Sequence, residues 1–143
     1  MILKIFKGVW FFSLVALFVL FFYIYAGLPE EVVFSETEGS LSISRNGFFY
    51  SSLVLFALVN TLVFVVSRLL SDGSQGFTSW FYGLVVTFNF FFLSSLGFMH
   101  VLNGGERYDY SQMGPMVYGS LILLCAWMLS WPGYTLYKKI LSK

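Results

Sequence analysis

Residues 9–28 read VWFFSLVALFVLFFYIYAGL and contain no Asp, Glu, Lys, Arg or His. Three further stretches share this property, residues 48–67, 77–99 and 115–137. A helix of about 20 residues rises about 30 Å, which is the thickness of the hydrocarbon core of a bilayer. The pattern therefore predicts an all-α integral membrane protein with four spans.

We expect a single transmembrane domain over residues 1–143, folded as an antiparallel four-helix bundle. The predicted spans are residues 8–28, 47–69, 77–102 and 115–137. Two outer loops, 29–46 and 103–114, and one cytoplasmic loop, 70–76, connect them. The cytoplasmic loop is short and rich in turn-forming residues, which makes spans two and three antiparallel neighbours. Pro132 is expected to bend or end span four.

The amino-acid composition is also typical of an integral membrane protein. Hydrophobic residues make up 58% of it, charged residues only 10%, and the mean hydropathy is +0.80. A soluble domain would carry about 25% charged residues. The net charge of +1 excludes the basic surface that nucleic-acid binding requires. The lone Cys125 cannot form an internal disulfide or a redox pair. The lipid bilayer is therefore the first expected partner.

The charges between the spans predict the orientation. Six of the eight Lys and Arg residues lie on the side of the termini and of loop 70–76: Lys4, Lys7, Arg68, Lys138, Lys139 and Lys143. The other side carries most of the acidic residues. Because cytoplasmic loops are enriched in Lys and Arg, we expect a bacterial inner-membrane protein with both termini in the cytoplasm. The first span is too long for a signal-peptide core and is expected to stay uncleaved.

Aromatic side chains cluster near the predicted ends of the spans. Trp10, Trp80 and Trp131 lie near the cytoplasmic ends. Amphipathic rings favour the headgroup region, so anchoring at the interface is the expected role. Stacking on a ligand is the alternative.

The first outer loop contains a pattern typical of strands. Residues 32–34 are apolar, Glu38-Gly39 provides a turn, and residues 40–44 alternate between polar and apolar. This predicts a short β-hairpin that leans on the bilayer, on the second outer loop or on a partner. Ser44 or Asn46 is expected to cap span two.

Two amides lie inside spans, Asn60 in the second and Asn89 in the third. An unpaired amide in hydrocarbon is costly, so both are expected to face the interior and to bond to each other or to neighbouring groups. The expected role of the two amides is therefore to hold neighbouring helices together. The alternative is a polar path, a possible pore lined by Asn60, Asn89, Thr87 and Ser94.

Span three also carries small residues on one face, and outer loop two carries charges. Ser79, Gly83 and Thr87 follow at intervals of four, with Gly97 further along, and form an expected helix-packing stripe. The outer loop presents a predicted contact patch of Glu106, Arg107, Tyr108 and Asp109. Its charges either pin the loop through a salt bridge or meet a partner.

The sequence contains no pattern for catalysis or for metal binding. His100, the only histidine, lies near the outer end of span three without a second ligand at metal-site spacing, so capping, interfacial bonding and pH sensing are its candidate roles. The spans hold no ionisable groups of the kind that pumps and intramembrane proteases need. We expect no enzyme, no metal and no cofactor.

Four short segments of the chain resemble a known group. Residues 25–33 (YAGLPEEVV), 44–50 (SRNGFFY), 104–110 (GGERYDY) and 129–132 (LSWP) are similar to uncharacterised four-span proteins of Bacteroidota-type bacteria. A more distant resemblance is to the unnamed membrane domain of toxin-immunity proteins. That domain has a His-aromatic-Asn stretch where this chain has Phe34-Ser35-Glu36.

These observations favour a non-catalytic protein that acts through contacts with other proteins. It would be an accessory or assembly subunit of a membrane complex, or a homo-oligomer. The alternative is an oligomeric channel or facilitator for a small ion or solute, with a polar path near Asn60 and Asn89.

Overall fold

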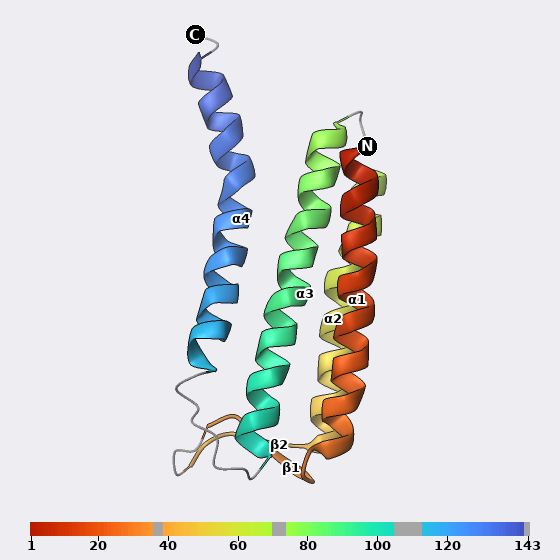
Figure 1. Cartoon of the computed structure of the whole chain (residues 1–143), viewed down its shortest axis with the longest axis vertical. Helices are drawn as coiled ribbons and strands as arrows, with labels where there is room; N and C mark the ends of the chain where they lie inside the picture. Colours follow the sequence, from red (N-terminus) through yellow and green to blue (C-terminus); the bar gives the residue numbers. More distant parts are fainter. Residues whose placement is uncertain (36–38, 70–73, 105–112, 142–143) are drawn as a thin grey trace.

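The computed structural model describes residues 1–35, 39–69, 74–104 and 113–141. Its helices and strands follow the order α1 (Ile2–Gly27), β1 (Glu31–Val33), β2 (Ser42–Ser44), α2 (Arg45–Leu69), α3 (Gln75–Asn103) and α4 (Gly114–Leu141). All four helices are long and apolar enough to cross a membrane, as predicted. Both termini lie at one end of the molecule, here called the terminal end, and both strands lie at the other, the hairpin end (Figure 1).

The helices extend further than the predicted spans. Helix α1 begins at Ile2 instead of residue 8, and α4 continues to Leu141, with Pro132 inside it. Pro132 therefore does not end the helix. A charged residue ends an uncharged stretch without ending the helix, because a helix that crosses a bilayer can continue into the headgroup region, where long Lys side chains reach water.

Three helices form the core. The most extensive helix contact joins α1 to α3, which run in the same direction, and α2 packs antiparallel to α3. Side chains from all three helices fill this core, and the most deeply buried are Leu17, Phe21, Ile24, Val63, Val85 and Asn89. The expected neighbours α2 and α3 do touch, but the parallel pair α1 and α3 has the more extensive contact.

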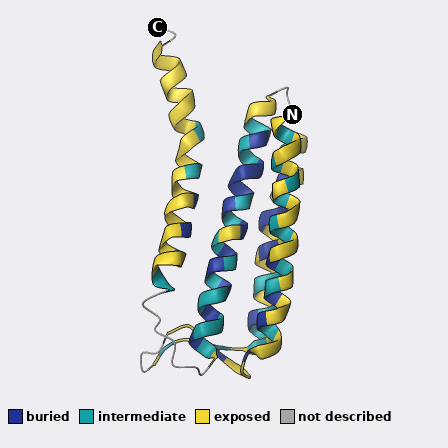
Figure 2. Ribbon diagram, in the orientation of Figure 1, coloured by how far each residue is buried: buried dark blue, intermediate teal, exposed yellow. Residues whose placement is uncertain are grey.

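Helix α4 stands apart from this core. Its backbone comes close to α3 alone among the described elements, and only Ser120 and Leu124 of its residues are buried. Figure 2 shows α3 largely buried and α4 largely exposed along its length. The four-helix bundle expected from the sequence is thus a three-helix core with a fourth helix laid on one side of α3.

The predicted hairpin is present. Strands β1 and β2 pair antiparallel, with Val32 opposite Ile43, and Ser44 Oγ accepts a hydrogen bond of 3.1 Å from the N–H of Gly47, so Ser44 caps α2. Val32 is 0% exposed, because the hairpin rests on α2 and α3. The support that a short hairpin needs comes from these helices.

Candidate functional site

The amides of Asn60 and Asn89 bond to each other between α2 and α3. Asn60 Nδ2 donates to Asn89 Oδ1 at 2.9 Å, and Asn89 Nδ2 donates to Asn60 Oδ1 at 3.0 Å. Asn60 is 5% exposed and Asn89 is 0% exposed. Both amides face the interior, and mutual pairing is one of the two arrangements that the sequence left open.

Helix α1 completes the polar network. Trp10 Nε1 donates to Asn60 Oδ1 at 2.9 Å, and Asn89 Nδ2 donates to Ser13 Oγ at 2.9 Å. Asn60 Nδ2 also donates to the carbonyl oxygen of Phe56 at 3.0 Å. A primary amide has two N–H donors and an oxygen with two lone pairs. All four of these positions are occupied at Asn60, so this amide has no capacity left for a solute.

Thr87 and Ser94 do not join the amides. Thr87 Oγ1 donates to the carbonyl oxygen of Leu84 at 2.7 Å, and Ser94 Oγ donates to that of Phe90 at 3.0 Å. At about 100° per residue, Thr87 and Ser94 lie about 160° and 140° around α3 from Asn89. Thr87 and Ser94 therefore lie on the side of α3 away from Asn89, and the four residues predicted as a possible pore lining do not come together.

The face of α3 opposite Asn89 carries the small-residue stripe and meets α4. A Cβ atom added to Gly83 would lie 2.8 Å from Trp127 Cε2 and 3.0 Å from Phe6 Cε1. A Cβ atom at Gly97 would lie 3.5 Å from Met113 Cε, just before α4 begins. Ser79 and Thr87 on this stripe are buried. Small residues let the Trp127 ring lie directly on the backbone of α3.

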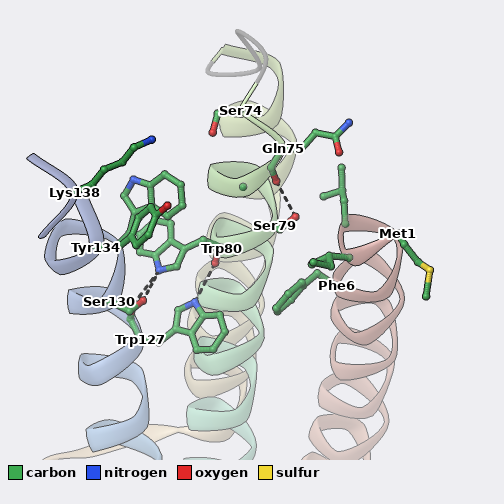
Figure 3. A pocket seen from close by; sticks show the side chains of 14 residues that line it. Met1, Phe6, Ser74, Gln75, Ser79, Trp80, Trp127, Ser130, Tyr134 and Lys138 are labelled. Atoms are coloured by element: carbon green, nitrogen blue, oxygen red, sulfur yellow. Dashed lines mark hydrogen bonds between the residues drawn. The ribbon is translucent and has the colours of Figure 1, made fainter. Parts of the chain in front are cut away.

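Two tryptophans fasten α4 to α3 by reciprocal hydrogen bonds. Trp80 Nε1 donates to the carbonyl oxygen of Trp127, and Trp127 Nε1 donates to the carbonyl oxygen of Trp80, both at 3.0 Å. Trp80 Nε1 also lies 2.9 Å from Ser130 Oγ. We call this pair, Trp80 and Trp127, the tryptophan clasp (Figure 3). It joins α4 to α3 in the part of the molecule near the terminal end.

An open groove of about 920 Å³ lies beside the clasp at the terminal end. Gly76 and Ser79 of α3 form part of its floor, Phe6 of α1 lies on one side, and Trp131 and Tyr134 of α4 lie on the other. Figure 3 shows Phe6 extending from α1 towards the clasp. Its volume falls within the range of small-molecule binding sites.

At the hairpin end, the side chain of Asn103 bonds like a third strand. The N–H of Val33 donates to Asn103 Oδ1 at 2.9 Å, and Asn103 Nδ2 donates to the carbonyl oxygen of Val33 at 3.1 Å. Asn103 Nδ2 also donates to the carbonyl oxygen of Met99. The last turn of α3 thereby fixes the position of β1.

Arg45 ties the start of α2 to the end of α1. Its Nη1 donates to the carbonyl oxygen of Leu28 at 3.3 Å, and its guanidinium carbon lies 5.8 Å from the centre of the Tyr25 ring. His100 lies near this region, with its ring centre 6.0 Å from that of Tyr23. Arg45 and His100 therefore each lie beside a tyrosine ring of α1, near the ends of their helices. The predicted patch of Glu106, Arg107, Tyr108 and Asp109 lies outside the described residues and stays a prediction.

Sequence reasoning missed several partners in these networks. Trp10 and Trp80 were expected at the interface, yet their indole N–H groups bond within the protein, and Trp127 and Ser13 were not singled out. Asn103 gave no signal, since an Asn next to Gly104 is also typical of a turn.

No family model matches this chain, and searches of curated proteins and of solved structures likewise find no match.

Proposed function

We propose that this chain is a non-catalytic, multi-pass protein of a bacterial inner membrane that acts by binding another membrane protein or a second copy of itself. The observation that carries the proposal is a row of small residues on the exposed side of α4, formed by Gly119, Ala126 and Gly133. An accessory or assembly subunit would use such a row to receive a helix of its complex.

The three small residues share one face of α4 because they are seven residues apart, which turns the helix by only about 20° per step. The buried residues of α4, Ser120 and Leu124, lie about 100–140° from Gly119 around the helix, and Trp127, which packs on α3, lies about 80° from it. No atom of another element lies within 4 Å of a Cβ atom added at Gly119 or Gly133. The row therefore points away from the rest of the described chain.

A row of small residues has a specific use in lipid. Hydrocarbon solvates Leu and Phe side chains as well as a neighbouring helix does, so helices associate where small residues let their backbones approach. The chain uses small residues internally as well, for example at Gly83 beneath Trp127. The row on α4 offers the same device to a helix from outside.

The proposed orientation places both termini in the cytoplasm. Lys4, Lys7, Arg68 and Lys138 belong to the terminal end, whereas the described acidic residues, Glu30 and Glu31, belong to the hairpin end. This distribution supports an inner-membrane protein by the preference of Lys and Arg for the cytoplasmic side.

The proposal is tested by extracting the tagged protein gently from its native membrane. Size determination and mass spectrometry of the co-purified chains then compare the unaltered protein with Gly119→Leu and Cys125→Leu variants. Cys125 is also exposed on α4 but lies about 80–120° around the helix from the residues of the row, so it provides a matched control. We expect a complex that Gly119→Leu weakens and Cys125→Leu preserves. A monomer without a co-purified chain would refute the proposal.

The channel alternative finds less support in the amide network. Its central residues, Asn60 and Asn89, already bond to each other and to Trp10 and Ser13. Ion flux into liposomes distinguishes the two functions. If the amides line a path, flux falls in Asn60→Leu and Asn89→Leu; equal leak in all three proteins leaves the channel without support.

A further inference from the structure

The side chains that line the groove at the terminal end change from apolar at its bottom to polar and charged at its mouth. Its lower part is lined by aromatic side chains, Phe6 of α1 and Trp127 of α4 (Figure 3). Its mouth carries the polar residues Ser74 and Gln75 and the ammonium group of Lys138. An amphiphile with an apolar tail and an anionic head has the complementary order of groups.

The bottom of the groove is closed by a ring contact. Phe6 of α1 and Trp127 of α4 meet with their ring centres 6.0 Å apart. Measured along α4 from Trp127 to Lys138, the groove is about 16 Å deep at 1.5 Å per residue. Half of a hydrocarbon core is about 15 Å thick, so the groove spans one leaflet. A helix that crosses the bilayer does not fit a site of this depth, whereas a lipid of that leaflet does.

The mouth of the groove has a positive electrostatic character. Lys138 reaches from α4 towards the N-terminal end of α3, where Ser74 caps the helix (Figure 3). The N-terminal end of a helix carries a partial positive charge and favours phosphate groups. Lys4, Lys7 and Arg68 add positive charge at the same end, and neither described carboxylate lies there. Basic pockets between transmembrane helices on the cytoplasmic side bind anionic headgroups.

We propose that this groove binds one phospholipid with an anionic headgroup. One acyl chain would lie on the floor formed by Gly76 and Ser79, between Phe6 and Trp131, and the phosphate would lie between Lys138 and the start of α3. This binding uses a different face of α4 from the row at Gly119, Ala126 and Gly133. It is independent of the proposed protein partner.

The protein contains its own reporters for this test. Three of its four tryptophans, Trp80, Trp127 and Trp131, line the groove, whereas Trp10 lies in the amide network. We would reconstitute the protein in phosphatidylcholine vesicles that contain equal fractions of either brominated phosphatidylglycerol or brominated phosphatidylcholine. Bromine quenches indole fluorescence on contact. Stronger quenching by brominated phosphatidylglycerol is the expected result, and removal of Trp10 by Trp10→Phe lowers the unquenched background.

Charge and shape variants make the test specific. Lys138→Gln should lower the preference for phosphatidylglycerol about fivefold, as expected for one Lys near an anionic surface. Lys139→Gln removes the same charge one residue away, outside the groove lining, and should retain most of the preference. Gly76→Leu fills the floor beneath Trp131 and should reduce quenching by both lipids. Equal quenching by the two lipids, or equal effects of the two Lys variants, would overturn the proposal.

Discussion

The two faces of α3 pack against their neighbouring helices in different ways. Towards α1 and α2, Asn89 enters a network in which the described polar atoms satisfy one another across three helices. Towards α4, small residues let Trp127 lie on the backbone, and the clasp adds two reciprocal hydrogen bonds. The first face buries most of its side chains, and the second leaves α4 exposed on its other sides.

The difference shows which helices find their packing and hydrogen-bonding partners within the described chain. The core of α1, α2 and α3 needs no further group to satisfy the amides of Asn60 and Asn89. Helix α4 has one neighbour among the described helices and still carries a second row of small residues. Association with another molecule is therefore expected at α4.

The largest effect on this comparison is expected for Gly83→Leu. Its side chain would displace the Trp127 ring and push against Phe6, separating α4 from α3. We expect the free energy of unfolding to fall by about 1–3 kcal/mol, the usual cost of overpacking. Unfolding in mixed micelles with increasing SDS measures it. Gly119→Leu, which adds the same side chain to the open side of α4, serves as the control. An equal loss in both variants would contradict the described packing.

A smaller effect is expected on the other face for Asn89→Leu. The change removes the partners of Asn60 and Ser13, and hydrogen bonds between transmembrane helices are worth about 0.6 kcal/mol on average and rarely above about 1.7 kcal/mol. We expect a loss of about 1–2 kcal/mol in the same titration. In a double-mutant cycle, Asn60→Leu combined with Asn89→Leu should cost less than the sum of the two single changes. Additive losses would mean that the two amides do not interact.

Trp10→Phe tests the contribution of α1 to that network. It removes the indole N–H that donates to Asn60 Oδ1 but retains an aromatic ring beside Phe64 and Tyr82. We expect a loss of about 0.5–1 kcal/mol, the net value of one hydrogen bond. In the Asn60→Leu background the same change should cost less. An unchanged cost there would assign the loss to packing of the ring alone.

The smallest effect on overall stability is expected for Asn103→Ala at the hairpin end. The side chain of Asn103 accepts from the N–H of Val33, so its removal exposes that N–H to exchange with solvent. Hydrogen exchange of the Val33 amide should accelerate about fivefold, as for loss of about 1 kcal/mol of local protection. Exchange in the middle of α3 should not change. Unaltered exchange at Val33 would show that the amide does not hold β1.

The sequence predicted what depends on local patterns. Hydropathy predicted four helices, alternation in residues 40–44 predicted the hairpin, and the cost of an unpaired amide predicted that Asn60 and Asn89 face the interior. The choice of neighbours was not predictable in this way. That α1 lies against α3, and α4 against α3 alone, depends on how rings such as Trp127 fit over Gly83, and three-dimensional fit leaves no periodic signal.

Cross-linking from α4 tests most directly whether this helix receives a partner. In a Cys125→Ser background, Ile122→Cys places a thiol beside the small-residue row, and Val54→Cys places one on the exposed side of α2. Each is labelled with a benzophenone maleimide and irradiated in native membranes. We predict a cross-link to a second protein chain from position 122 and little from position 54. Equal yields from both positions, or no protein adduct from position 122, would contradict the account.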